Sequence, residues 1–219
     1  MVLSARQLCA EIRRGNNCEP TGIAVVPTPD LSKLESDGEA SVNLRLGRWF
    51  LTLRQSSETH LDATATGNSK ENRFSKKYFV PFGESFILHP NRFVLASTLE
   101  WIKLPSRYAA FVVGKSTLGR RGIIIETAAG VHPGFSGCLT LEIANVGEIP
   151  VKLTSGMLIC QLFFHSIEGN LSTTQTPLGG QRKPRLGQLR EDPILNSLIR
   201  TRAVPEKSES EGIHKVFEM

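Results

Sequence analysis

Residues 84–114 read ESFILHPNRFVLASTLEWIKLPSRYAAFVVG, and this stretch decides the fold class. Its apolar runs are four to seven residues long and are separated by turn-forming residues such as Pro, Asn and Ser. Short runs rich in Val, Ile, Phe and Trp and bounded by such residues are typical of β-strands. Short strands at regular spacing, with almost no helix between them, predict an all-β sandwich or barrel.

The same pattern continues on both sides of this stretch. Residues 41–47 alternate so that Val42, Leu44 and Leu46 face one way, which indicates a half-buried strand. We expect further strands at 49–53, 78–80, 84–88, 92–98, 101–104, 109–114, 122–126, 137–144, 149–153 and 157–165.

The N-terminus differs from the rest of the chain. Residues 4–15 predict a short helix, with Ser4 as its N-cap and Gly15 as its stop signal. Residues 16–38 contain three prolines and few periodic apolar residues, so we expect an extended loop there.

Polar composition marks the remaining segments. We interpret residues 55–77 as a mobile insertion within a single domain spanning 1–190. Residues 166–190 form an irregular C-terminal tail that resembles a lid. The extension at 191–219 is expected to be partly disordered, with a helical turn or two at 193–202.

The charge of the chain favours an anionic ligand. The formal net charge is +5, which suits a nucleotide but does not require nucleic acid. Basic residues without interleaved aromatics argue against binding of single-stranded nucleic acid, since Trp and Tyr together number four. We therefore expect a small anionic ligand.

The four cysteines contain no C-x-x-C pair, so we expect small buried thiols in a reducing compartment. No signal peptide is recognisable at the N-terminus. No apolar run approaches the ~20 residues that would span a bilayer. These observations predict a cytoplasmic protein without a membrane partner.

The segment Gly114-Lys115-Ser116-Thr117 combines a glycine, a lysine and two hydroxyls after an apolar strand. Exposed N–H groups beside a lysine suit a phosphate oxygen. A complete phosphate-binding P-loop is excluded, because the upstream glycine that its pattern requires before Gly114 is missing. An ordinary hairpin turn explains the local residues equally well.

Glu142 is the only acid in the apolar run 138–144. Strand alternation places it on the same face as Cys138, Thr140 and Ala144. A carboxyl group on a half-buried face is expected to have a raised pKa, as general acid–base catalysis requires. The alternative is a surface glutamate. Arg120 and Arg121 would point to opposite sides, which allows one to face a ligand and the other solvent. The alternative is two solvated arginines.

Several motifs, in order along residues 1–190, resemble the dCTP deaminase family. The matching segments are 40–47 (ASVNLRLG), 86–90 (FILHP), 114–120 (GKSTLGR), 133–142 (PGFSGCLTLE) and 150–163. The resemblance implies a distorted jelly-roll or β-barrel of the dUTPase-like type. It also implies zinc-independent deamination of dCTP to dUTP, which supplies dUTP for dTTP synthesis. The zinc-binding motifs of other nucleobase deaminases are missing from the sequence.

The resemblance assigns roles to individual residues. Glu142 would be the general base that activates the attacking water, Ser116 and the carbonyls near Ala128 and Ala129 would hold that water, and Arg120 would orient the base. Substrate-binding residues would be Lys115, Thr117, Ala128, Ala129, Val131, His132, Gln161, Gln181, Arg182 and Lys183.

The resemblance also implies partners. The family's active sites lie between the subunits of a homotrimer, and Mg²⁺ accompanies the triphosphate as part of the ligand. No tightly bound cofactor and no protein-bound metal are expected.

Three departures from the family pattern keep alternatives open. His132 stands where the family has an Asp that contacts the sugar, and Asn43 replaces a common Asp. Pro177-Leu178 stand where the tail has Lys-Tyr. A bifunctional dCTP deaminase/dUTPase and a catalytically diverged nucleotide-binding relative therefore remain alternatives.

Overall fold

The computed structural model describes residues 1–54, 74–126, 130–169, 180–187 and 192–202, which belong to two units. The first unit, Met1–Thr59 with Ser69–Gly187, holds all the described strands. In the second unit, the described part contains α5 (Pro193–Arg202), which confirms the helix predicted there. The expectations of mobility at 55–73 and of disorder at 203–219 lie outside the described residues.

The main sheet bends around β2 (Ser41–Leu53), a strand of 13 residues. The first part of β2 pairs with β11 (Leu158–Ser166), and the later part pairs with β5 (Arg92–Lys103) on one edge and β3 (Ser75–Phe79) on the other. A register shift between Leu46 and Phe50 marks the change of neighbour. Such a shift increases the local twist, which lets one strand serve two parts of a curled sheet.

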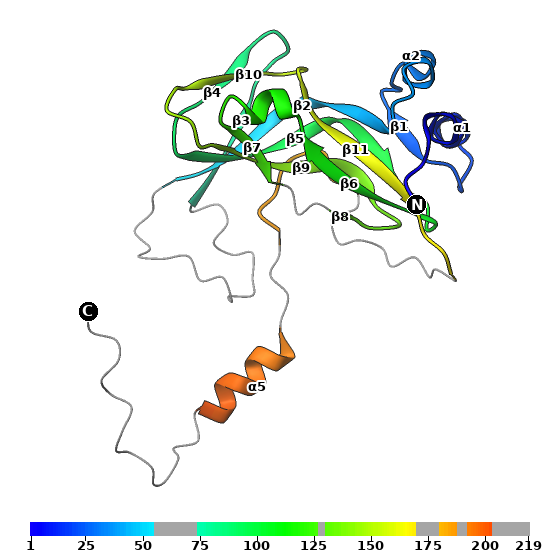
Figure 1. The fold of residues 1–219 in the computed structure, drawn as a ribbon. Helices are drawn as coiled ribbons and strands as arrows, with labels where there is room; N and C mark the ends of the chain where they lie inside the picture. Colours follow the sequence, from blue (N-terminus) through cyan, green and yellow to red (C-terminus); the bar gives the residue numbers. More distant parts are fainter. Residues whose placement is uncertain (55–73, 127–129, 170–179, 188–191, 203–219) are drawn as a thin grey trace. The chain divides into compact units, whose positions relative to one another are not determined.

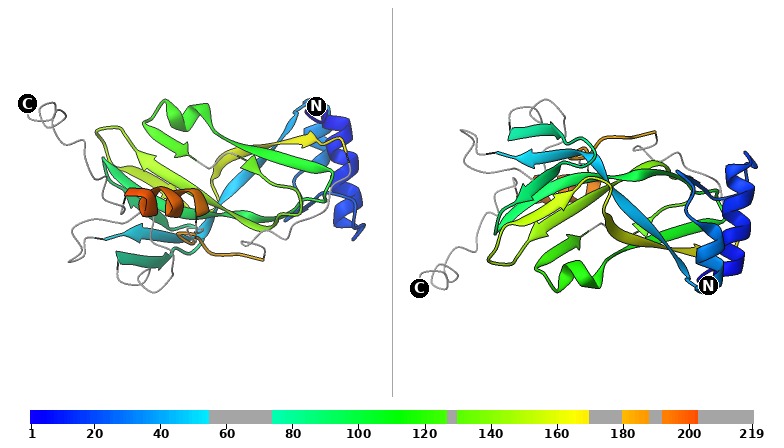
Figure 2. Two further views of the ribbon diagram at one scale, coloured as in Figure 1. Left: turned by 90° about the horizontal axis from the view of Figure 1, so that it is seen from below. Right: turned by 90° about the horizontal axis from the view of Figure 1, so that it is seen from above.

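The sheet order is β7-β9-β5-β2-β11-β6-β8, with β1 added to β5 and β3 added to β2. All of these pairs are antiparallel, and Figures 1 and 2 show the sheet curling into a barrel-like shape. A separate two-stranded sheet joins β10 to β4. The remaining strands are β1 (Ala24–Val26), β4 (Ser85–Leu88), β6 (Tyr108–Gly114), β7 (Ile123–Glu126), β8 (Gly130–Val131), β9 (Ser136–Asn145) and β10 (Val151–Thr154).

The barrel closes where β6 approaches β7, two strands that stand near opposite ends of the sheet order. A Cβ added at Gly114 of β6 would lie 3.3 Å from Cβ of Ile125 on β7, so glycine permits this close approach. Within the described residues, no hydrogen-bonded ladder joins these two strands. The predicted all-β, distorted barrel is confirmed.

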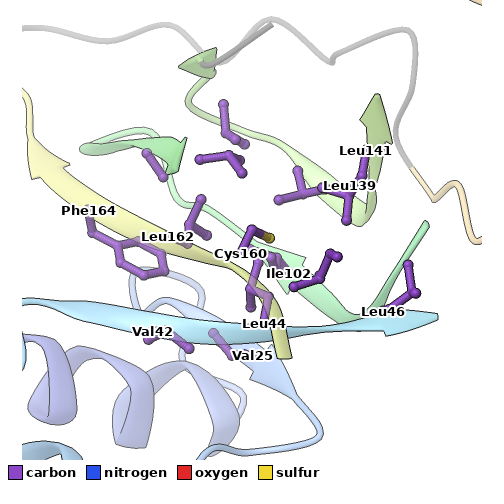
Figure 3. Close-up of a cluster of buried hydrophobic side chains, with 14 of the residues drawn as sticks. Val25, Val42, Leu44, Leu46, Ile102, Leu139, Leu141, Cys160, Leu162 and Phe164 are labelled. Carbon is purple, nitrogen blue, oxygen red and sulfur yellow. The ribbon is translucent and has the colours of Figure 1, made fainter. Parts of the chain in front are cut away.

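The core fills the inside of this curled sheet. Figure 3 shows side chains of β2, β5, β9 and β11 pointing toward one another, among them Leu44, Ile102, Leu141 and Leu162. These four side chains are 0% exposed. Complete burial of such a side chain stabilises the fold by roughly 1.5–3 kcal/mol. The predicted alternation of Val42, Leu44 and Leu46 is confirmed, because all three belong to this core.

The N-terminal helix forms as predicted but ends later. Ser4 caps α1 (Ala5–Asn16) in a capping box with Gln7. Gly15 lies inside the helix, so its prediction as a stop signal was wrong. A Cβ at Gly15 would lie 2.1 Å from the carbonyl oxygen of Ile23, and this close approach is the physical reason for glycine there.

Two further predictions of irregular structure were wrong. Residues 16–38 contain β1, which pairs with β5, and α2 (Leu31–Ser36). Asp30 caps α2 by accepting a hydrogen bond from the N–H of Lys33 at 3.0 Å. The predicted insertion at 55–77 is too long, because β3 begins at Ser75 and pairs with β2. Favourable local capping and strand pairing outweighed the polar composition.

Among the described helices, none has both the length and the apolar character needed to cross a membrane. Three of the four cysteines are buried, as predicted, whereas Cys18 is exposed.

Candidate functional site

The connection from β6 to β7 holds four predicted site residues. Lys115 precedes the single helical turn α4 (Ser116–Gly119), and Arg120 follows it. Ser116, Thr117 and Arg120 are exposed, and Lys115 is half-buried. The hairpin alternative was wrong, because β6 pairs with β8 and β11 whereas β7 pairs with β9.

Lys115, which follows β6, is held by a residue of β2, the next strand but one in the sheet. Its ammonium donates a hydrogen bond to Oδ1 of Asn43 on β2. Nδ2 of Asn43 donates in turn to Oε2 of Glu39 at 3.1 Å. The three side chains therefore form a chain from the start of β2 to the end of β6.

Gln161 lies beside this chain. On β11 it is in register with Asn43 of β2 and with Val113 of β6. Oε1 of Gln161 accepts a hydrogen bond from Oγ of Ser41 at 3.4 Å. Residues directly opposite each other on paired strands share a face. Predicted residues Lys115 and Gln161 are thus brought to the same region of the barrel.

The two adjacent arginines differ in their contacts. The Arg121 guanidinium donates to the carbonyl of Thr117 at 2.7 Å and so holds the end of α4. Arg120 is exposed at the C-cap of the same turn. The predicted role of Arg120 in orienting the base stays a prediction.

Glu142 lies on β9, on the face opposite the core. Thr140, Glu142 and Ala144 are half-buried, whereas Leu139, Leu141 and Ile143 are buried. This alternation confirms the predicted face for the carboxylate. Glu142 is in register with Glu126 of β7 and Leu95 of β5. The raised pKa expected for Glu142 remains a prediction.

The tail segment 180–187 runs beside β9. Gly180 N–H donates to the Ser136 carbonyl at 2.5 Å, and the Cys138 N–H donates to the Gln181 carbonyl at 2.7 Å. Nε2 of Gln181 donates to Oγ1 of Thr140 at 2.6 Å. Thr140, which this side chain contacts, lies two residues before Glu142 on β9.

Gln181 also carries an unused acceptor. The residue is 8% exposed, and its Oε1 is buried without a hydrogen-bond partner among the described residues. An orphaned buried acceptor normally costs ~1–3 kcal/mol. Gln181 therefore presents an acceptor next to the outer face of β9.

The next two tail residues carry positive charge over different neighbours. Nζ of Lys183 lies 4.0 Å from the centroid of the Trp49 ring, a cation–π geometry. Arg182 is exposed. Burial raises the pKa of the Cys138 thiol, and the charge of Arg182 opposes that rise only in part. Sequence patterns did not reveal Trp49 as a contact of the tail.

The remaining predicted residues follow β7. Val131 is buried on β8 and pairs with Ala110 of β6, and its role in substrate binding stays a prediction. His132 is exposed, and its carbonyl accepts the N–H of Phe135 at 3.2 Å. Ala128 and Ala129 lie outside the described residues.

Glu100 is a titratable residue that the sequence analysis missed. It is 5% exposed, and its Oε2 accepts the N–H of Arg45 at 2.8 Å. Burial raises the pKa of this carboxyl group. Burial, assisted by the charge of Glu100, also raises the pKa of Cys160 to about 12. The signal was available, since Glu100 is the only acid in the apolar run 93–102.

The site thus has two parts with β7 as a common neighbour. The α4 turn packs against β7, and β7 pairs with β9, which carries Glu142. One part supplies a lysine, an arginine and hydroxyls, and the other a half-buried carboxylate beside Gln181. In the described part of the chain, no group of three or more His, Cys, Asp or Glu side chains is arranged to hold a metal ion.

Comparison with known proteins shows which family this chain resembles. Residues 2–167 match the family model described as dCTP deaminase-like. The chain is 40% identical over 164 residues to a "dCTP deaminase, dUMP-forming" of Salinispora arenicola, covering 74% of this chain and 78% of that protein. It is 36% identical over 174 residues to a "dCTP deaminase" of Natronomonas pharaonis, covering 79% and 85%.

A solved structure shares the fold. The 2'-deoxycytidine 5'-triphosphate deaminase of Agrobacterium tumefaciens superposes with a TM-score of 0.53 at 21% identity, over 74% of this chain and 46% of that chain. The family model covers all strands of the barrel together with the α4 turn and Glu142. On these grounds, the chain belongs to the dCTP deaminase-like family.

Proposed function

We propose that this protein deaminates dCTP to dUTP by hydrolysis, releasing ammonia. The observation that carries the proposal is the family match over residues 2–167, which includes the α4 turn and Glu142. The relatives that match are named dCTP deaminases. The partly exposed carboxylate of Glu142, on the outer face of β9, agrees with this activity.

Glu142 is the proposed general base. Its carboxylate takes a proton from water as the oxygen attacks C4 of cytosine, and the electron pair of the C4–N3 double bond moves to N3, which receives that proton as a tetrahedral centre forms. The same carboxyl group then carries the proton of the new hydroxyl to the departing amine, so that the C4–N bond breaks, C4 becomes a carbonyl, and dCTP and water become dUTP and ammonia. Half-burial suits this role, because a partly desolvated carboxylate holds a proton more readily than a fully hydrated one.

The α4 turn is proposed to bind the rest of the substrate. Ser116 is proposed to hold the attacking water, and Arg120 to orient the base. Lys115 is proposed to contact the phosphates, assisted by Arg182 and Lys183 of the tail. Mg²⁺ enters with the triphosphate as part of the ligand, where it shields the negative charge.

The test is a turnover assay that records ammonia and pyrophosphate in parallel. The wild-type protein should release one ammonia per dCTP consumed. Glu142→Gln keeps the shape of the side chain but cannot accept the proton, so kcat should fall by about 10²–10⁴-fold. Glu148→Gln makes the same change at an exposed turn residue and should leave kcat unaltered. Absence of ammonia from the wild-type protein with every cytosine nucleotide would refute the proposal.

A second candidate is formation of dUMP in the same protein. The observation that favours it is the name of the relatives from Salinispora arenicola and Dictyoglomus thermophilum, "dCTP deaminase, dUMP-forming". His132 stands where the family's sugar-contacting Asp is expected, which argues against this second step. Pyrophosphate released in step with ammonia would establish it, and ammonia alone would exclude it.

We further propose a homotrimer with active sites between subunits. Phe111 and Val113 leave 45% and 43% of their surface exposed on the outer face of β6, which supports burial against another copy. Light scattering after gel filtration should give three times the chain mass of 24.1 kDa. A monomer at micromolar concentration would refute this assembly.

A reducing, cytoplasmic location is proposed as well. Its support is that all four cysteines are free thiols. Fractionation of the producing cells should recover the protein with cytoplasmic markers.

A further inference from the structure

Asn43 stands between a cation and an anion. The Lys115 ammonium donates to its Oδ1, and its Nδ2 donates to Glu39 Oε2 at 3.1 Å. Glu39 is exposed, whereas Asn43 and Lys115 are half-buried. Along this line the charges therefore run from a negative end at the surface to a positive end beside the α4 turn.

The two neighbours fix the orientation of the Asn43 amide. A carboxylate only accepts hydrogen bonds and an ammonium only donates them. The Nδ2 end must therefore face Glu39, and the Oδ1 end must face Lys115. A carboxylate at position 43 would be repelled by Glu39 and would pair with Lys115, so an amide is the group that satisfies both neighbours.

The amide also leaves the lysine charge unneutralised. An ammonium has three donors, and one is used on Asn43. Within the described residues, Lys115 makes no ion pair. Because Asn43 is neutral, the full positive charge of Lys115 remains for an anionic ligand.

We propose that Asn43 is a positioning residue that holds the Lys115 ammonium for the phosphates of the nucleotide and keeps it apart from Glu39. This inference rests on the proposed function, in which Lys115 contacts phosphate. Without the amide, Lys115 is free to pair with Glu39, and the substrate must compete with that carboxylate. Asn43 thus acts on substrate affinity through Lys115 and does not touch the reacting atoms.

The test separates KM from kcat for dCTP. Asn43→Ala should raise KM about tenfold, the worth of one charge-assisted hydrogen bond, and leave kcat within about twofold. Asn43→Asp should raise KM further, because it places a competing carboxylate on Lys115. Asn17→Asp makes the same chemical change at an exposed residue and should leave both constants unaltered.

Two double variants test the route of the effect. Adding Glu39→Ala to Asn43→Ala should restore part of the lost affinity, since it removes the competing anion. In a Lys115→Ala background, Asn43→Ala should have no additional effect on KM, because coupled residues are not additive. Melting temperatures within about 2 °C of wild type exclude a folding defect.

The outcomes are decisive in both directions. A fall in kcat at constant KM, additive effects of Asn43→Ala and Lys115→Ala, or no effect of Asn43→Asp would each overturn the inference. If the wild-type protein shows no deamination, calorimetric titration with dCTP replaces kinetics. Tenfold weaker binding to Asn43→Ala would then support the positioning role although the proposed reaction had failed, and equal or absent binding would overturn it.

Discussion

Replacing Gly15 with alanine should destabilise the protein, although the same change normally strengthens a helix. Gly15 lies in the last turn of α1, where it faces the chain that leads into β1. An added Cβ would lie 2.1 Å from the carbonyl oxygen of Ile23 and 2.7 Å from the N of Ala24. These obstacles are backbone atoms, so no change of rotamer relieves them.

The magnitude follows from two opposing contributions. A carbon and a carbonyl oxygen approach to about 3.3 Å, so α1 and residue 23 must separate by about 1.2 Å. Such a shift disturbs the packing of Leu8 and Ile12, both 0% exposed. Overpacking of this kind costs up to about 3 kcal/mol, and the higher helix propensity of alanine offsets about 1 kcal/mol of it. The free energy of unfolding should fall by about 2 kcal/mol.

Thermal unfolding followed by circular dichroism measures this change. A loss of about 2 kcal/mol lowers Tm by about 4–8 °C in a chain of this size. Gly119→Ala is the matched control, because it also lies in a helix and its added Cβ meets nothing within 4 Å. That variant should melt at or slightly above the wild-type temperature. If Gly15→Ala melts as high as Gly119→Ala, then α1 does not lie against residues 22–24 as described.

Three other predictions concern titratable groups and the tail. Burial raises the pKa of Glu100, so the folded state binds the proton of this carboxyl group more tightly than the unfolded state does. The contribution of Glu100 to stability is therefore fully present below its ordinary pKa and is lost as pH rises through the raised pKa of the folded state. Glu100→Gln should therefore flatten the fall in Tm above about pH 4.5, and an unchanged profile would contradict the assignment. In the folded protein, a thiol reagent at neutral pH should rapidly label one cysteine, the exposed Cys18, and it should label all four only after unfolding. Fast labelling of Cys160 would contradict the burial and the raised pKa of this thiol. Gln181→Ala removes the bond to Thr140, so trypsin should cleave after Arg182 severalfold faster than in the wild-type protein. An equal rate would show that the tail is not held at this residue.

Strand existence was predictable because it depends on local pattern. Val42, Leu44 and Leu46 alternate in sequence and lie in the core, and the half-buried face of Glu142 followed from the same period of two. The predicted positions of the strand ends were less accurate. The two strands predicted at 92–98 and 101–104 are a single strand, β5 (Arg92–Lys103), because a register shift between Ser97 and Trp101 carries the chain past its polar interruption.

Features that depend on distant contacts were not predictable from pattern. Gly15 was expected to end a helix. A glycine is needed at this position because the backbone of Ile23 lies close to it, and nothing in the local sequence indicates that contact. Lys115 was identified from its own segment, but its partner Asn43 comes from a strand 72 residues earlier. The same holds for Lys183 and Trp49, which are brought together by the docking of the tail.

The approach of β6 to β7 has a consequence for motion in the native state. Since packing of Gly114 against Ile125 closes the barrel there, a small widening breaks no interstrand hydrogen bond among the described residues. Local opening along this line should therefore cost less free energy than opening between β5 and β9, and amide hydrogen exchange should be faster in β7 than in β5. Because Lys115 follows the last residue of β6, the same opening changes the separation of its ammonium from the carboxylate on β9. Small adjustments of nucleotide position are thus available to this fold without local unfolding.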